Sequence, residues 1–155
     1  TIGCLVAWLA GQVPGCDVCL VDVNPTRRAV ASALGVGFAE PSAPPADADV
    51  VVHASADPAG LVLGLELAGF ESTVVEMSWY GTTPVTLPLG EGFHAKRLTL
   101  LSSQVGHVSA SRRARWDYRR RMALALSLLA APELDVLITG ESAFEELPAV
   151  MASLA

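Results

Sequence analysis

The sequence predicts a doubly wound α/β fold, in which helices cover both faces of a parallel β-sheet. Segments of strand type alternate along the chain with segments of helix type, which is the signature of that fold. Residues 18–23 form an apolar run with almost no polar side chain, as expected for a parallel strand buried on both faces. With 155 residues, 52% of them hydrophobic, the chain suits one domain, residues 1–155, with a substantial core.

Prolines and glycines set the boundaries of the expected elements. Pro14 and Gly15 stop the first helix, Pro25 suits the first turn of the second, and Gly35 ends it. The expected helices cover residues 2–13, 24–34, 58–69, 111–131 (capped by Ser111) and 147–155. The expected strands cover residues 18–23, 36–39, 49–54, 73–77 and 97–103, with a short strand or extended piece at 134–138. Residues 41–45 and 81–93 are expected to be irregular because they are rich in proline or glycine.

Charge, hydropathy and cysteine content restrict the function. A net charge of -6 argues against a general nucleic-acid binder. No apolar run reaches the roughly 20 residues that span a bilayer, so we expect no membrane partner. Without a secretion signal, the three cysteines indicate reduced thiols and a cytoplasmic location. Cys16 and Cys19 form a C-x-x-C sequence. A redox motif would precede a helix, whereas this one precedes a strand, and a zinc site would need a second pair of ligands, which is absent. We therefore expect both cysteines to be small, mostly buried residues without a chemical role.

A glycine and an acid lie nineteen positions apart, at Gly3 and Asp22. A dinucleotide site needs a glycine where the first helix meets the sheet and an acid after the second strand, about 20 residues on. The Asp22 carboxylate would accept both hydroxyls of an adenosine ribose and repel a 2′-phosphate, which favours NAD over NADP. Arg27 and Arg28 weaken that preference slightly, and we expect Arg28 to be a solvated helix residue. Because the first strand and two earlier glycines are absent, we expect a sheet that lacks its first strand.

Asp22 also fits a structural role in a turn or a helix cap. The histidines and the arginine-rich segment likewise allow both a functional and a structural interpretation. His53, His94 and His107 match no zinc spacing, so we expect them to line a crevice or the surface. The sequence has no G-x-S-x-G elbow, which argues against a serine hydrolase. Six arginines surround Trp116 and Tyr118 at positions 112, 113, 115, 119, 120 and 121. They suit a nucleic-acid surface or a solvated helix face with Trp116 packed inward, and the acidic chain favours the second.

Taken together, these segments resemble the cofactor-binding half of the medium-chain dehydrogenase/reductase superfamily, in its zinc-dependent alcohol dehydrogenase branch. The segments that resemble the family's turns and strands are residues 1–3, 21–27, 49–59, 73–81, 97–106 and 144–150. Ala56 and Ser78 stand where the family usually has glycine. The resemblance implies that the cofactor is bound by Gly3, Asp22, Arg27, Ala54, Ser55, Met77, Ser78 and Gln104, with Met77, Ser78 and Gln104 at the nicotinamide end.

The resemblance also implies an activity and partners. An oxidoreductase of this family transfers hydride between an alcohol or carbonyl substrate and NAD(P), and its zinc ligands lie in a separate N-terminal domain. We therefore expect no catalytic or metal-binding residue in this chain, an incomplete N-terminus, and no activity from the chain alone. The family commonly dimerises through an edge strand, which here would run from Arg97 to Ser103.

Two other functions remain possible from the sequence. The first is a non-catalytic NAD-binding or interaction module, and the second is a Rossmann-like methyltransferase, which also places an acid after its second strand. The order of the later strands favours the dehydrogenase. A short-chain dehydrogenase would need a Tyr-x-x-x-Lys pair, but Pro84 follows Tyr80 at that spacing and Met122 follows Tyr118.

Overall fold

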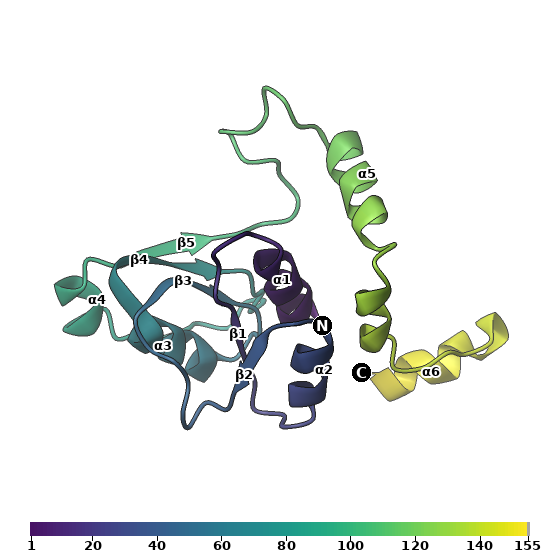
Figure 1. Ribbon diagram of the computed structural model, residues 1–155, viewed down its shortest axis with the longest axis horizontal. Coiled ribbons are helices and arrows are strands. Elements are labelled where there is room, and N and C mark those ends of the chain that lie inside the picture. Colours follow the sequence, from purple (N-terminus) through teal and green to yellow (C-terminus); the bar gives the residue numbers. More distant parts are fainter. Residues whose placement is uncertain (155) are drawn as a thin grey trace.

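The computed structural model describes residues 1–154 and has the expected parallel α/β architecture (Figure 1). The strands are β1 (Cys19–Val21), β2 (Gly37–Ala39), β3 (Ala48–His53), β4 (Ala68–Glu76) and β5 (Thr99–Ser102). The helices are α1 (Ile2–Gly11), α2 (Arg27–Ala33), α3 (Pro58–Leu67), α4 (Gly92–Ala95), α5 (Tyr118–Leu128) and α6 (Leu147–Leu154), with 3-10 helices η1 (Pro132–Leu137) and η2 (Phe144–Glu146). All strand pairings among the described residues are parallel.

The strands form two separate sheets rather than the single sheet that the sequence predicts. One sheet pairs β1 with β2, and the other has the order β3-β4-β5. In a doubly wound fold the first strand lies between the second and the fourth, which correspond here to β1 and β3. The division between the two sheets therefore falls where the sequence places the absent first strand.

Each sheet has its own hydrophobic core. The first core joins α1, β1, α2 and η1 through Cys4, Ala7, Trp8, Leu20, Ala31, Leu34 and Leu134. The second joins α3, β4 and the start of β5 through Leu61, Leu65, Ala68, Val74 and Leu98. Val74 is fully buried, so the centre of β4 anchors the second sheet. These two cores fix the carboxyl ends of β1, β3 and β4.

The C-terminal third differs from the sequence prediction. The long helix begins at Tyr118 instead of Ser111, because the side chain of Asp117 accepts the backbone N–H of Arg120 and caps the helix there. The segment expected to be extended at residues 134–138 is instead the 3-10 helix η1, which begins at Pro132. The last helix was expected to reach Ala155, which lies outside the described residues.

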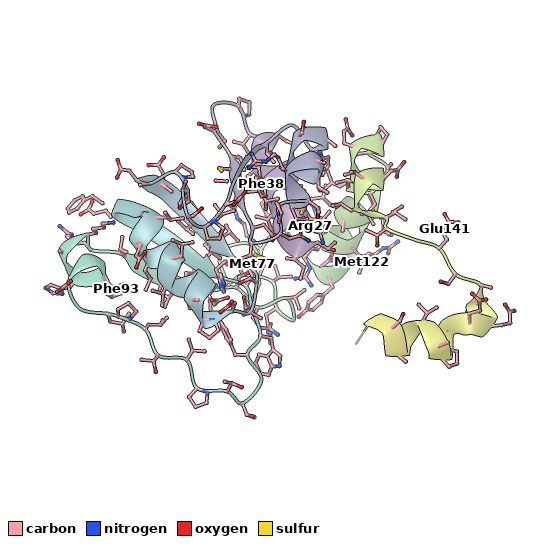
Figure 2. The ribbon with its side chains drawn as sticks, turned by 90° about the horizontal axis from the view of Figure 1, so that it is seen from below. Arg27, Phe38, Met77, Phe93, Met122 and Glu141 are labelled. Atoms are coloured by element: carbon pink, nitrogen blue, oxygen red, sulfur yellow. The ribbon has the colours of Figure 1, made fainter. Side chains whose placement is uncertain are left out.

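Helices α5 and α6 lie beside the sheets, and Leu128 at the end of α5 packs against the first core. A long loop leads from β5 to α5, and α5 and α6 lie to one side of both sheets in Figure 1. No residue of α5 is buried, and its Met122 is 61% exposed. Figure 2 shows Arg27 and Phe38 on the β1–β2 side and Phe93 at the far end, beyond α3. Among the described helices, none combines the length and apolar character needed to cross a membrane.

Candidate functional site

Polar side chains gather where β3 and β4 end. His53 is the last residue of β3 and Glu76 the last of β4, and the parallel register places them opposite each other. Ligand sites of open α/β sheets lie outside the carboxyl ends of the strands, so this is the edge where a ligand is expected. Figure 2 shows Met77, the residue after β4, near the middle of the molecule.

Glu76 and His53 form the centre of a hydrogen-bond network. The Nδ1 atom of His53 lies 2.7 Å from Oε2 of Glu76, and its Nε2 lies 2.7 Å from the Ser55 hydroxyl. Ser78 donates its backbone N–H to Oε1 of Glu76 at 2.6 Å. The Tyr80 hydroxyl donates to Oε2 of Glu76 at 3.0 Å. His53 is only 6% exposed and the side chain of Glu76 13%, whereas Ser55 at the edge of the network is exposed.

The pKa values of Glu76 and Tyr80 indicate which groups donate the hydrogen bonds of this network. Burial opposes the charge of Glu76, but hydrogen bonds from Ser78 and His53 outweigh burial and lower its pKa. Burial and the neighbouring Glu76 raise the pKa of Tyr80 to about 12. Glu76 is therefore an ionised acceptor, and Nδ1 of His53 carries a proton. In the neutral imidazole, Nε2 then accepts the Ser55 hydroxyl proton.

The order Ser55–His53–Glu76 matches the hydrogen-bond relay of a serine hydrolase, but this turn lacks the donors that the chemistry needs. An acyl-transfer site requires free amide N–H groups beside the nucleophile to stabilise an oxyanion. The amide of Ala56 donates instead to the Ser78 hydroxyl at 3.0 Å, and the amide of Asp57 donates to the Ser55 hydroxyl at 3.2 Å. The network therefore ties the two turns together, in keeping with the lack of a nucleophile elbow.

Ala56 and Ser78, which stand where the family usually has glycine, are hydrogen-bonded to each other. Ala56 has a φ of 58°, in the left-handed region that costs alanine more than glycine. The Ser78 hydroxyl, which glycine would lack, accepts the Ala56 amide. Met77 also donates its amide to the His53 carbonyl at 2.9 Å. The turns after β3 and β4 are thus held together, and they bring Ala54, Ser55, Met77 and Ser78 to one place.

Asp22 lies on the other sheet, directly after β1. Its half-buried carboxylate accepts the amide of Asn24 through Oδ1 at 2.8 Å, and Asn24 in turn accepts the amide of Thr26. This turn leads to Arg27, the first residue of α2. The side chain of Arg28 is 61% exposed, in keeping with the expectation of a solvated helix residue. It also lies 3.6 Å from the carboxylate of Glu40 and over the ring of Phe38.

Gly3 and Gln104 lie apart from this network. A Cβ atom at Gly3 would lie 3.8 Å from Cδ1 of Leu20, an ordinary contact, so the packing of α1 on β1 does not itself require glycine. The exposed Gln104 side chain lies 3.2 Å from Nδ1 of His107, within its own loop. Glu76 and Tyr80, which the sequence did not single out, are instead central to the site.

The described residues offer no ready-made metal centre. Within residues 1–154, no three His, Cys, Asp or Glu side chains gather in a group that could hold a metal ion. The cysteines are free thiols: Cys4 is buried and Cys19 half-buried, whereas Cys16 is exposed and so does not fit the expectation of burial. Burial raises the pKa of Cys19, and the nearby carboxylate of Asp17 adds to this effect.

Comparison of the whole chain with solved structures finds similar folds at low sequence identity. The chain is similar to benzyl alcohol dehydrogenase from Acinetobacter calcoaceticus, with a TM-score of 0.72 and 16% identity over 98% of this chain and 43% of that one. It is similar to an alcohol dehydrogenase from Escherichia coli CFT073 complexed with NADH, with a TM-score of 0.72 and 19% identity over 97% and 44% of the two chains. No protein-family model and no curated protein matches the sequence.

A third similar structure is the protein yhfP of Bacillus subtilis with NAD bound. Its TM-score is 0.68 at 17% identity, over 98% of this chain and 46% of that one. The chain thus spans less than half the length of these three structures. At such low identity the comparisons establish the fold, and they place this chain among structures with a Rossmann-like α/β fold.

Proposed function

We propose that the chain is the cofactor-binding part of an alcohol dehydrogenase-like oxidoreductase. The observation that best supports this is the half-buried Asp22 carboxylate directly after β1, where a ribose would lie in a dinucleotide-binding fold. Two similar structures hold NADH or NAD. In this proposal the bound dinucleotide supplies hydride chemistry between an alcohol and a carbonyl compound, and the chain binds and orients it.

The proposed contacts follow the carboxyl ends of the strands. The first amides of α1, including that of Gly3, have no partner within the helix and would donate to the pyrophosphate. Asp22 would accept the ribose hydroxyls, because one of its oxygens already holds the turn and the other is left for a ligand. Arg27 would lie at the adenine side, Ala54 and Ser55 near the adenosine, and Met77, Ser78 and Gln104 near the nicotinamide.

The preferred cofactor in this proposal is NAD. A carboxylate at position 22 would repel the 2′-phosphate of NADP, although one similar structure, a zinc-binding dehydrogenase of Sinorhizobium meliloti, is bound to NADP. In this proposal, as in the family that the sequence resembles, any catalytic zinc would be held by a separate domain. We therefore expect no zinc-dependent dehydrogenase activity from these 155 residues alone.

Calorimetric titration of the purified chain tests the proposal. NAD should bind more tightly than NADP, and Asp22→Asn should weaken NAD binding about tenfold, equivalent to about 1.4 kcal/mol, because a charge-assisted hydrogen bond to the ribose is lost. Asp135→Asn, an exposed acid in η1, is the matched control and should bind NAD like the wild type.

Two results would contradict the cofactor assignment. Binding of NAD that is unchanged by Asp22→Asn would remove Asp22 from the site. Binding of S-adenosylmethionine in preference to NAD would favour the methyltransferase alternative. NAD binding without turnover, even when the chain is joined to a zinc domain, would favour the non-catalytic module.

A further inference from the structure

An unusual concentration of arginines lies between β5 and the second turn of α5. Six of the ten basic residues of this acidic chain fall at positions 112, 113, 115, 119, 120 and 121. The ion pairs among residues 1–154 are Arg28–Glu40, His53–Glu76 and Arg97–Glu71, so none of the six is paired with a carboxylate there. Like charges this close repel one another, so hydrogen bonds within the chain or a bound anion would stabilise the arrangement.

Three of the six arginines donate hydrogen bonds to backbone carbonyls of the same segment. Arg113 donates through Nε to the carbonyl of Val108 at 3.0 Å, and Arg121 donates to the carbonyl of Val105 at 2.8 Å. Arg120 donates to the carbonyl of Arg115 at 2.6 Å. These bonds hold the loop against the start of α5. By contrast, the side chains of Arg112, Arg115 and Arg119 make no hydrogen bond within the part of the chain that the structure describes.

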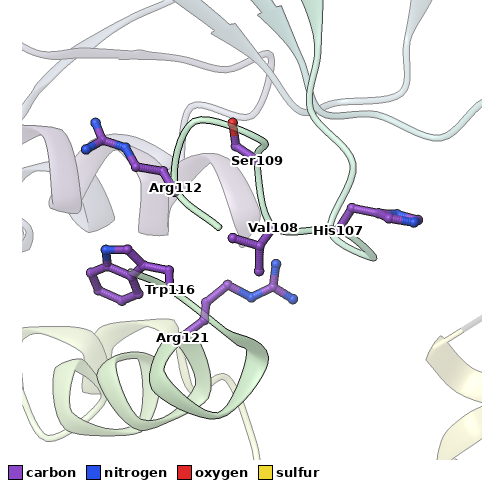
Figure 3. A pocket seen from close by; sticks show the side chains of 6 residues that line it. All are labelled: His107, Val108, Ser109, Arg112, Trp116 and Arg121. Atoms are coloured by element: carbon purple, nitrogen blue, oxygen red, sulfur yellow. The ribbon is translucent and has the colours of Figure 1, made fainter. Parts of the chain in front are cut away.

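Four of the six arginines line two adjoining hollows together with Trp116, and we call the two hollows the arginine hollow. The larger hollow, about 350 Å³, is shown in Figure 3 and is lined by His107, Val108, Ser109, Arg112, Trp116 and Arg121. The smaller one, about 280 Å³, is lined by Ser111, Arg112, Arg115, Trp116 and Arg120. Arg112 and Trp116 belong to both, so they form the wall between them. The half-buried Trp116 is therefore not packed into either core, contrary to the expectation from sequence.

The chemistry of this wall suits a ligand with both negative charge and a flat ring. The planar guanidinium group binds phosphate through paired N–H donors, and Arg112 and Arg115 have these donors available. The guanidinium of Arg120 lies 4.3 Å from the centre of the Trp116 ring and stabilises the indole in place. Indole rings stack on flat heterocycles such as nucleobases. The larger hollow, at about 350 Å³, lies at the lower end of the range for small-molecule sites.

We propose that the arginine hollow binds a small phosphorylated ligand that carries a heteroaromatic ring, with its phosphates on Arg112 and Arg115 and its ring against Trp116. A small ligand is favoured over a nucleic-acid strand because the chain as a whole is acidic and repels a long polyanion outside this segment. Neither Asp22 nor any residue of the turns after β3 and β4 lines the arginine hollow, although His107 of its lining lies 3.2 Å from Gln104, which the cofactor proposal places near the nicotinamide. The observations behind the arginine hollow do not depend on the cofactor proposal.

Tryptophan fluorescence and calorimetry with three probes test this site. The probes are inorganic pyrophosphate for the charge alone, adenosine for the ring alone, and adenosine diphosphate for both. Adenosine diphosphate should bind most tightly and quench the emission. The double variant Arg112→Gln/Arg115→Gln should weaken pyrophosphate and adenosine diphosphate binding at least tenfold, and Trp116→Phe should abolish the quench. Trp8 is buried in the first core and Trp79 is 85% exposed, so neither should report the event.

Matched controls separate this site from the proposed cofactor site. The double variant Arg28→Gln/Arg97→Gln removes two arginines that have carboxylate partners, and it should leave pyrophosphate binding unchanged. Asp22→Asn, which tests the cofactor site, should also leave pyrophosphate binding unchanged. Thermal melting should show that Arg112→Gln/Arg115→Gln folds normally, because neither side chain makes a described hydrogen bond.

The proposal is overturned if Arg112→Gln/Arg115→Gln binds pyrophosphate like the wild type. It is also overturned if adenosine diphosphate binding is lost in Asp22→Asn but kept in Arg112→Gln/Arg115→Gln, since the nucleotide would then occupy the cofactor site. Tighter binding of a thymidine oligonucleotide than of adenosine diphosphate would also overturn the proposal, because the ligand of the arginine hollow would then be a nucleic-acid strand.

Discussion

Glu76 is the residue that joins the turns after β3 and β4. Its carboxylate accepts hydrogen bonds from the imidazole of His53, the amide of Ser78 and the hydroxyl of Tyr80. Its side chain is 13% exposed, so these bonds are only weakly screened by water. Any change to this carboxylate should therefore affect both turns, including the proposed contacts of Ser55 and Ser78.

Replacing Glu76 with Gln tests this role through the pH dependence of stability. Because the folded-state pKa of Glu76 lies below its ordinary value of 4.5, its contribution is fully present above that value and is lost as pH falls through the lowered pKa. At neutral pH, Glu76→Gln should lower the free energy of unfolding by about 2 kcal/mol, because charge-assisted hydrogen bonds are lost. Urea unfolding at neutral pH and near pH 3 measures the difference from the wild type.

Urea unfolding at acidic pH decides whether the charge of Glu76 stabilises the fold. The difference between the wild type and Glu76→Gln should shrink on acidification, whereas the exposed control Glu145→Gln should remain within about 0.5 kcal/mol of the wild type at neutral pH. A difference that stays constant from neutral to acidic pH would show that the charge of Glu76 does not stabilise the fold.

The family resemblance suggests Ser55, Met77 and Ser78 as cofactor contacts, and this stays a prediction. The sequence did not indicate the pairing of His53 with Glu76, because the pairing depends on the register of β3 against β4, and that register shifts between Ala48 and Val50. A one-residue slip would turn each side chain to the opposite face of the sheet.

At the scale of the elements, the first turn of α3 covers the His53–Ser55 pair. The side chain of Asp57 accepts the amide of Ala59 and caps the helix, and Pro58 occupies the tolerated first position. Gly60, the third residue of α3, lies against this pair. A Cβ atom at Gly60 would lie 2.8 Å from Nε2 of His53 and 2.9 Å from the Ser55 hydroxyl.

Gly60→Ala should therefore destabilise the protein even though alanine is the better helix former. We expect a loss of about 1–2 kcal/mol, because the new methyl group must push apart the hydrogen-bonded His53 and Ser55 side chains. Thermal or urea unfolding measures the change. Gly90→Ala is the control, since a Cβ there meets no atom within 4 Å. Greater stability of Gly60→Ala than of the wild type would show that the pair moves aside at no cost.

The start of α5 could not be placed from the sequence, because two capping residues lie close together there. Ser111 and Asp117 are both good capping residues, and the sequence alone gave no reason to prefer the later one. In the structure Asp117 has extended backbone with φ of -117° and caps the helix, while the side chain of Arg113 reaches back to the carbonyl of Val108. This side-chain bond ties residues 111–116 to the preceding loop, and sequence patterns do not reveal it.

At the scale of the molecule, the parallel α/β class agrees with the sequence, whereas the single sheet that the sequence predicts is divided into two in the structure. β5 is an edge strand, hydrogen-bonded to β4 on one side. Its Leu100 and Leu101 are 37% and 53% exposed. An exposed apolar edge strand is a template for pairing with another chain, and we propose that two copies of the protein pair through it.

Analytical ultracentrifugation tests this pairing. Leu101→Lys should shift the equilibrium toward monomer by at least tenfold, because a buried lysine opposes edge-to-edge pairing. Leu126→Lys changes an equally exposed leucine of α5, 62% exposed, and should leave the equilibrium unchanged. A wild-type protein that sediments as a monomer at all accessible concentrations would contradict the proposal.

The burial of Leu134 among residues of α1, β1 and α2 has a consequence for how the chain reaches its native state. Leu134 is separated from Cys4 and Trp8 by most of the sequence, yet all three belong to the first core. A two-stranded sheet as short as β1–β2 is not stable by itself, and contacts so distant in sequence form slowly. During synthesis the β3–β5 sheet can close first, whereas the N-terminal sheet must wait until η1 has emerged from the ribosome.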